Sequence, residues 1–180
     1  MNQKFFQAYI SPDIELVLVQ DGFVPDYVRL AEKDFDYLSE WLEWPRFCIT
    51  EVDFKKFVSE SIASFEACES MNCAIKYKEM IAGTAGFNKI DRKLSRAEIG
   101  YWIGSEFQKN GIVTEVCRFL IAYAFENLRL NKVQMSVAVE NKPSRAVCER
   151  LNMKLEGIIT NEECIGGRIL DHAIYAAYSD

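Results

Sequence analysis

The middle of the chain has the pattern of a strand, a helix and a second strand, and this unit constrains the fold most. Residues 96–103 are rich in β-branched and aromatic side chains, which is typical of a strand. From about Ile112 to Leu128 the apolar residues take helical spacing, and residues 132–139 are apolar and alternating. Because a crossover helix of this length can return the chain, the two strands are predicted to pair in parallel.

The flanking segments predict antiparallel strands and further helices. Strands are expected at residues 14–19, 73–78, 81–87, 155–160 and 169–178, and helices at about 24–44, 53–68 and 143–151. No internal repeat or linker divides the sequence. We therefore expect residues 1–180 to form a single α/β domain, with a mixed, mostly antiparallel twisted sheet that has a central parallel strand pair and is flanked by helices.

Composition narrows the class of partner. The chain has 180 residues, 49% of them apolar, which is enough for one sizeable core. Its net charge of −6 disfavours a nucleic-acid or anionic-membrane binder, because both partners require clustered Lys and Arg. An acidic surface suits a cationic partner better.

The cysteine pattern and the N-terminal sequence predict a cytoplasmic protein. The six cysteines form no C-x-x-C pair and do not cluster with the only histidine, His172, so neither a metal site nor a disulfide framework is expected. Cys117 and Cys148 fall on apolar stripes of predicted helices, as reduced cysteines do. The N-terminus lacks a signal pattern, and the longest apolar run, 119–125, is too short for a membrane span.

The loop between the first strand and the helix of the central unit, Gly104 to Gly111, carries the first sign of chemistry. Backbone N–H groups at a helix start, together with the helix dipole, favour an anion. Gly111 permits close backbone approach, and Gln108 and Lys109 add donors. An ordinary turn before a helix has the same pattern. The dinucleotide and nucleoside triphosphate motifs G-x-G-x-x-G and G-x-x-x-x-G-K-[ST] do not occur in the expected places.

Four motifs follow one another in a characteristic order: Ala97-Glu-Ile-Gly-Tyr-Trp-Ile103, Gln108-x-x-Gly111, Val139-Glu-Asn-Lys-Pro-Ser-Arg145 and Leu151-Asn-Met-Lys-Leu-Glu-Gly157. In this order they resemble the GCN5-related N-acetyltransferase (GNAT) superfamily, most closely the RimJ/RimL branch, which acetylates N-terminal amines of ribosomal proteins. The resemblance is strong over residues 73–178, and Leu38–Pro45 resembles the first-helix signature of the branch. Val113 departs from the family's small residue, and Leu151-Asn-Met153 replaces Leu-Gly-Phe.

The resemblance implies acetyl-CoA as cosubstrate, no metal, and direct attack of an amine through a tetrahedral intermediate. It places the pyrophosphate on residues Gln108, Lys109, Asn110, Gly111, Ile112, Val113 and Thr114. It places Asn141 against the pantetheine arm and an oxyanion-binding backbone N–H at about Trp102 and Ile103. Ser144 is the candidate that protonates the leaving thiolate. Alternatively, Asn141 and Ser144 only satisfy backbone groups at a helix start.

The general base has two candidates. The resemblance favours Glu163, in the predicted final hairpin, and the neighbouring Glu162 leaves the register open. Glu98 is the rival, because acidic residues on that strand act as bases elsewhere in the superfamily. As an internal strand residue, Glu98 also suits a structural hydrogen bond. We interpret His172 as structural.

Three functions remain open at this stage. The resemblance favours acetylation of a protein N-terminus, with ribosomal proteins as acceptors. Acetylation of a small polycationic amine, such as a polyamine or aminoglycoside, needs only an acidic acceptor groove. A non-catalytic acyl-CoA sensor is the third. The apolar last strand is consistent both with a homodimer contact and with a core strand; the residues concerned are Ile169, Leu170, Ile174 and Tyr175.

Overall fold

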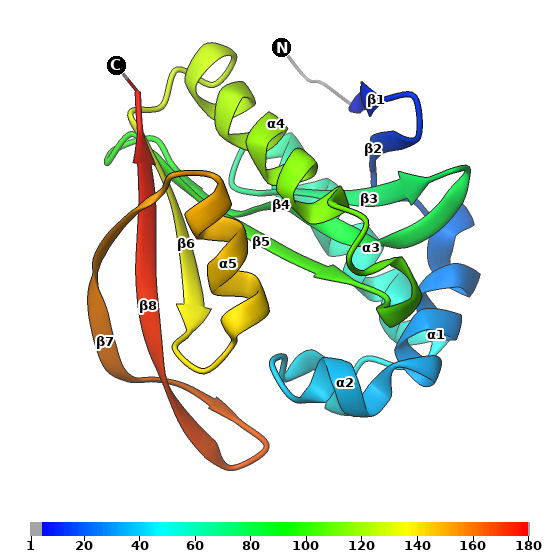
Figure 1. The fold of residues 1–180 in the computed structure, drawn as a ribbon. Helices are drawn as coiled ribbons and strands as arrows, with labels where there is room; N and C mark the ends of the chain where they lie inside the picture. Colours follow the sequence, from blue (N-terminus) through cyan, green and yellow to red (C-terminus); the bar gives the residue numbers. More distant parts are fainter. Residues whose placement is uncertain (1–4, 180) are drawn as a thin grey trace.

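The computed structural model describes residues 5–179, and it contains an eight-stranded sheet in the order β1-β2-β3-β4-β5-β6-β8-β7 (Figure 1). The strands are β1 (Gln7–Ser11), β2 (Ile14–Leu18), β3 (Met71–Tyr77), β4 (Met80–Asp91), β5 (Arg96–Ile103), β6 (Lys132–Ala138), β7 (Lys154–Ile165) and β8 (Arg168–Tyr178). Within the described residues, β5 and β6 pair in parallel and all other neighbours pair antiparallel. The predicted mixed sheet with a central parallel pair is confirmed.

Helices cover both faces of this sheet. They are α1 (Val24–Lys33), α2 (Phe35–Ser39), α3 (Glu51–Glu66), α4 (Ile112–Glu126) and α5 (Lys142–Arg150). In Figure 1, α4 and α5 lie in front of the sheet, whereas α1 and α3 lie behind it. None of the helices within residues 5–179 combines the length and the apolar content that a membrane crossing needs. Residues 1–4, which belong to the segment where no signal pattern was expected, lie outside the described residues.

Three predicted elements differ from the structure. The edge strand β1 was not predicted, because its sequence Gln-Ala-Tyr-Ile-Ser has no clear apolar alternation and none of its residues is fully buried. The predicted helix 24–44 is interrupted at Asp34, which leaves helical geometry with φ −110° and ψ 21°. β7 continues past residue 160 because an irregularity lets it resume pairing with β8 at Glu163.

Two helices that position the site begin at capped residues. The Thr50 hydroxyl accepts a hydrogen bond from Asp53 N at 3.3 Å, and this capping box starts α3. The Asn141 side chain accepts a hydrogen bond from Ser144 N at 3.1 Å and starts α5, with Pro143 in the first turn as predicted. The cap therefore fixes Ser144 at the start of α5.

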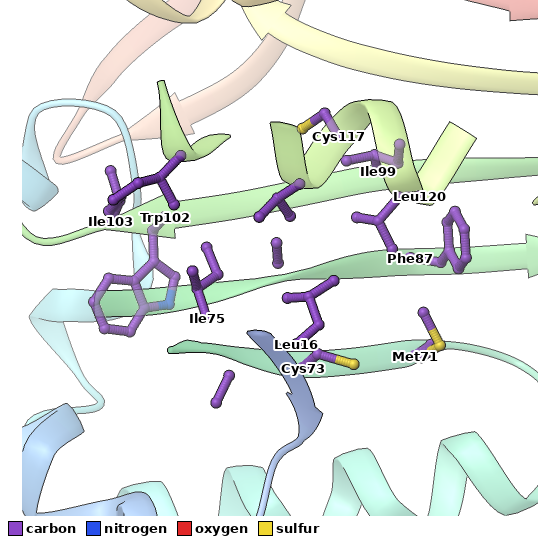
Figure 2. Close-up of a cluster of buried hydrophobic side chains, with 14 of the residues drawn as sticks. Leu16, Met71, Cys73, Ile75, Phe87, Ile99, Trp102, Ile103, Cys117 and Leu120 are labelled. Carbon is purple, nitrogen blue, oxygen red and sulfur yellow. The ribbon is translucent and has the colours of Figure 1, made fainter. Parts of the chain in front are cut away.

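The core joins the sheet to α4 and to the helices behind it. Figure 2 shows Leu16, Ile75 and Phe87 from three neighbouring strands in one buried cluster with Cys117 and Leu120 of α4. All five are essentially inaccessible to solvent. Cys117 is reduced and packs as a small apolar side chain, as its position on a helical stripe predicted.

The parallel pair β5 and β6 separates soon after it begins. Its register covers three residue pairs and ends at Glu98 and Gln134. β5 continues to Ile103 and β6 to Ala138 without pairing to each other, and Figure 1 shows the two strands diverging. An opening therefore forms in the middle of the sheet, with backbone groups that no neighbouring strand satisfies.

Candidate active site

A cavity of about 1500 Å³ occupies the opening between β5 and β6. It is lined from the α4–α5 side by Tyr101 and Ser144, and from the opposite side by Glu98 and His172. Because it reaches both faces of the sheet, two reactants can approach each other through it from opposite sides.

The segment from Gln108 to Thr114 forms one end of this cavity. Gly111 takes a left-handed conformation with φ 76° as the N-cap of α4, and Lys109 does the same with φ 62°. No side chain caps the first N–H groups of α4, so they are available to an anion. The Arg150 guanidinium, which donates to Thr114 Oγ1 at 3.3 Å, adds positive charge beside them. We call residues 108–114 the phosphate loop.

The predicted phosphate-loop residues do not all have the same role. Gln108, Lys109, Gly111, Ile112, Val113 and Thr114 line the cavity. The Asn110 side chain instead donates to the carbonyl groups of Phe107 and Gln108, at 3.1 Å each, and braces the loop. Val113 is partly buried and packs against the core.

On the α4–α5 side, Ser144 is paired with a residue that the sequence did not single out. Its Oγ lies 2.6 Å from the hydroxyl of Tyr101, which comes from β5. Burial raises the pKa of Tyr101 well above its usual range, so this hydroxyl stays protonated at neutral pH. The two hydroxyls therefore form a hydrogen-bonded pair at the cavity wall.

On the opposite side, three residues form a second polar group. His172 on β8 is buried; its Nδ1 lies 2.8 Å from Ser136 Oγ, and its Nε2 lies 3.2 Å from Glu163 Oε2, an ion-pair distance without hydrogen-bond alignment. Residues 160–162 of β7 oppose the single residue Asp171, and this bulge precedes Glu163. His172 is bonded to Ser136 within the sheet, as a structural residue would be. Its ring also lines the cavity beside Glu163, the candidate base.

The rival base, Glu98, lies at the last paired position of the parallel strands. Its Oε2 accepts a hydrogen bond from the Gln134 side chain at 2.8 Å. Glu98 lines the same cavity as Glu163 and Glu162. Both base candidates therefore lie in the same cavity. Glu98 also makes a side-chain hydrogen bond of the structural kind that its strand position suggested.

The backbone of β5 has a definite polarity at the opening. Gly104 N donates to Ala82 O of β4 at 2.8 Å. Since N–H directions alternate along a strand, the N–H of Ile103 points the other way, toward the opening. The Trp102 side chain packs behind the sheet, with its ring 6.2 Å from Tyr27 and 5.3 Å from Trp44. Of the two residues proposed for the oxyanion, Ile103 has the suitable N–H direction.

The β7–β8 turn and the segment that follows α2 bound the side of the cavity that carries Glu98 and Glu163, which we call the acceptor side. Gly166 N donates to Glu43 Oε2 at 2.8 Å, and the Arg168 guanidinium lies over the Trp41 ring, 5.9 Å from its centre. Trp41 and Glu163 both line the cavity, so these contacts lie at its rim. Within residues 5–179, no three His, Cys, Asp or Glu side chains are grouped closely enough to hold a metal ion.

Comparison with known proteins places this geometry in a family. The family model described as the acetyltransferase (GNAT) domain matches residues 19–154. This chain belongs to the GNAT acetyltransferase family. Members of this family use acetyl-CoA, so the chain is an acetyl-CoA-dependent N-acetyltransferase, as the four motifs indicated.

Two relatives by sequence show how far the likeness extends. The ribosomal-protein-serine acetyltransferase of Escherichia coli (strain K12) is 27% identical over 171 residues, which cover 95% of this GNAT chain and 96% of that protein. YdaF of Bacillus subtilis (strain 168) is 39% identical over 106 residues, which cover 59% of this chain and 58% of YdaF. The chain thus matches little more than half of YdaF but nearly all of the first relative.

Solved structures give the same assignment. The RimL ribosomal L7/L12 α-N-protein acetyltransferase in complex with coenzyme A is 25% identical, with a TM-score of 0.92 over 96% of this chain and 98% of that chain. The Microcin C7 self-immunity acetyltransferase MccE in complex with acetyl-CoA and AMP is 27% identical, with a TM-score of 0.90 over 94% of both chains. Both GNAT structures contain a form of the cofactor, coenzyme A in the first and acetyl-CoA in the second.

Proposed function

We propose that this enzyme transfers the acetyl group of acetyl-CoA to the N-terminal amine of a protein, with ribosomal proteins as the acceptor class. The observation that carries the proposal is the cavity that crosses the sheet between β5 and β6. It has an anion-binding helix start at one end and carboxylates on the opposite face. Similarity over nearly the whole chain to a ribosomal-protein-serine acetyltransferase supports the choice of acceptor.

The phosphate loop would hold the pyrophosphate of acetyl-CoA. The uncapped N–H groups of α4 and the left-handed Gly111 supply backbone donors, while Lys109 and Arg150 supply positive charge. Asn141 would contact the pantetheine arm with its amide N–H group, because its oxygen is already used by Ser144 N. When bound, acetyl-CoA supplies the acetyl group.

Ser144 and Tyr101 would supply the proton that the leaving thiolate needs. Ser144 Oγ lies at the cavity wall and would pass its proton to the thiolate, while the Tyr101 hydroxyl, 2.6 Å away, would return a proton to the serine oxygen. Tyr101 also lines the cavity and would regain its own proton from solvent there. The N–H of Ile103 would hold the developing negative charge on the carbonyl oxygen.

Glu163 would remove the proton from the incoming amine. Its side chain is 42% exposed and lies at the rim of the acceptor side, where an ammonium group enters from solvent. His172, anchored by Ser136, would orient this carboxylate. Glu98 is less suited, because Gln134 holds one of its oxygens deep in the sheet.

The rim contacts favour a slender acceptor. Because Gly166 and Arg168 bind the Trp41 segment, the β7–β8 turn and the N-terminal helices are joined beside Glu163. A chain terminus fits such an entry. The cavity lining on the acceptor side carries more acidic than basic side chains, with Arg168 added at the rim; the lining residues are Glu40, Asp53, Glu60, Glu98, Glu162 and Glu163 against Lys56. This charge also suits a small polycationic amine, which is the second candidate acceptor.

An acceptor screen tests the proposal. Thiol release from acetyl-CoA is measured with N-terminal peptides of ribosomal proteins, polyamines and aminoglycosides. We expect peptides to give the highest kcat/KM. Faster turnover of a polyamine or an aminoglycoside would replace the proposed acceptor. Thermal stabilisation by acetyl-CoA, with no release above hydrolysis for any acceptor, would favour the sensor.

Gly111→Val is predicted to weaken acetyl-CoA binding about 10-fold. A β-branched residue is strained at φ 76°, and the strain, on the order of 1–2 kcal/mol, moves the loop that would hold the phosphates. Gly167→Val is the matched control, because Gly167 has φ 83° and equally open surroundings in the β7–β8 turn. Calorimetric titration with CoA measures both variants. Equal affinity of Gly111→Val and the unmodified enzyme would argue against the phosphate loop.

A further inference from the structure

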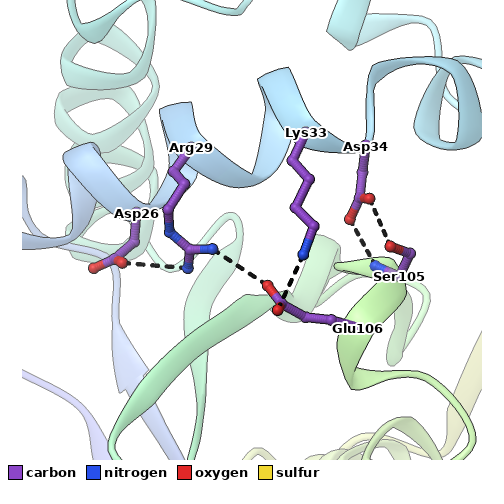
Figure 3. Close-up of polar contacts among 6 residues, drawn as sticks. All are labelled: Asp26, Arg29, Lys33, Asp34, Ser105 and Glu106. Atoms are coloured by element: carbon purple, nitrogen blue, oxygen red, sulfur yellow. Dashed lines mark hydrogen bonds and ion pairs between the residues drawn. The ribbon is translucent and has the colours of Figure 1, made fainter.

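A buried carboxylate joins the N-terminal helices to the segment just before the phosphate loop (Figure 3). Asp34 lies between α1 and α2 and is 6% exposed. Its Oδ2 accepts a hydrogen bond from Ser105 N, and its Oδ1 accepts one from Ser105 Oγ, both at 2.6 Å. Both oxygens of the carboxylate therefore serve one residue.

Both contacts of Asp34 run to a carboxylate oxygen. A buried carboxylate is unfavourable unless hydrogen bonds replace those of water, and among residues 5–179 Asp34 has no ion-pair partner, so its two bonds to Ser105 provide this replacement. An amide side chain could keep both contacts, because its oxygen accepts from Ser105 N and its nitrogen donates to the Ser105 hydroxyl, which both donates and accepts. Those bonds would be neutral and therefore weaker than the bonds to a carboxylate.

Residues next to Ser105 also lie close to α1. A Cβ atom on Gly104 would lie 2.8 Å from Leu30 Cδ2 and 3.3 Å from Asp34 Oδ2. Figure 3 also shows Glu106, which pairs with Arg29 at 3.2 Å and with Lys33 at 3.0 Å. Those ion pairs are about half-exposed, and exposed pairs contribute little. Asp34 is therefore the principal side-chain polar contact between α1 and this segment.

We infer that Asp34 is a positioning residue for acetyl-CoA. Ser105 begins the short helical turn η3 (Ser105–Phe107), which leads directly into Gln108. A phosphate site built from backbone N–H groups works only when the loop is held in one geometry. Asp34 fixes the turn that leads into the phosphate loop. Asn110 braces the middle of the loop, and α4 fixes its end. The inference rests on the proposed phosphate loop.

The experiment compares Asp34→Asn with Glu106→Gln and uses two acetyl donors. S-Acetylpantetheine shares the thioester and pantetheine arm with acetyl-CoA but lacks the pyrophosphate. For Asp34→Asn we expect KM for acetyl-CoA to rise about 10- to 30-fold, because two charge-assisted hydrogen bonds become neutral ones, with kcat within about twofold. Its kcat/KM with S-acetylpantetheine should stay unchanged. Glu106→Gln should change neither donor by more than about twofold.

The result that overturns the inference is an equal loss with both donors, or an unchanged KM for acetyl-CoA. If Asp34→Asn does not fold, Ser105→Ala takes its place, because it removes only the hydroxyl contact; we expect a rise in KM of about 3- to 10-fold for acetyl-CoA alone. Gly111→Val distinguishes failure of the phosphate loop itself from failure of its positioning by Asp34. Weak binding by Gly111→Val with normal binding by Asp34→Asn overturns only the role of Asp34. Normal binding by both overturns the phosphate loop as well.

Discussion

Ser144→Ala is expected to lower kcat by about 10²-fold, within the usual range for an acid–base group. The substitution removes the hydroxyl that faces the cavity and leaves the backbone intact, since the cap of α5 uses Ser144 N and not Oγ. KM for acetyl-CoA should therefore stay within about twofold, which places the loss in the chemical step. Steady-state thiol release at saturating acceptor measures both constants.

Tyr101→Phe separates a proton donor from its partner. If Ser144 gives the proton and Tyr101 refills it, Tyr101→Phe should lower kcat less than Ser144→Ala, and the double variant should resemble Ser144→Ala. Because burial raises the pKa of Tyr101, its hydroxyl stays protonated near neutral pH. Ionisation of Tyr101 should therefore not change kcat in that pH range. Unchanged turnover of Ser144→Ala would remove this residue from the mechanism.

Glu163→Gln is expected to lower kcat/KM for the acceptor by about 10²- to 10³-fold. A carboxylate can take the proton of the incoming amine, whereas the amide of glutamine cannot, so the loss should appear in kcat/KM for the acceptor while the binding of acetyl-CoA stays unchanged. Steady-state thiol release at varied acceptor concentration, with calorimetric titration of CoA, measures both effects.

Two glutamates serve as matched controls for Glu163. Glu162 is its neighbour and lines the same cavity, so Glu162→Gln tests general loss of negative charge. Glu98→Gln tests the rival base, and it keeps a polar partner for Gln134. We expect both controls to keep kcat/KM for the acceptor within about threefold of the unmodified enzyme. A loss of about 10²-fold in Glu98→Gln, with nearly normal turnover of Glu163→Gln, would move the base to β5.

The central unit of the fold was predictable because its signals are local. The alternation of residues 96–103 and 132–139 and the helical spacing between them are set by which face each residue buries. The break at Asp34 was not predictable. The apolar spacing continues across it, and the interruption coincides with a contact to Ser105, which lies 71 positions later in the sequence.

The candidate site was predictable where a motif marks it and hidden where side chains meet across elements. Gly111 and Asn141 show local signals, a left-handed helix start and a helix cap. Tyr101 was part of a quoted motif, but its role depends on facing α5, which a strand sequence does not reveal. Arg150 and His172 reach the cavity through packing of distant elements, Arg150 beside Thr114 and His172 beside Ser136. Their sequence positions gave no corresponding signal.

The position of the acetyl group on a product peptide shows directly whether the enzyme acetylates an N-terminal amine. The substrate is a peptide with a ribosomal-protein N-terminus, a free α-amine and one internal lysine, and the control is the same peptide with a blocked α-amine. After incubation with acetyl-CoA, tandem mass spectrometry locates the added acetyl group. We expect modification of the α-amine alone and no reaction of the control peptide. Acetylation of the lysine in both peptides, or of neither peptide while a polyamine reacts, would contradict it.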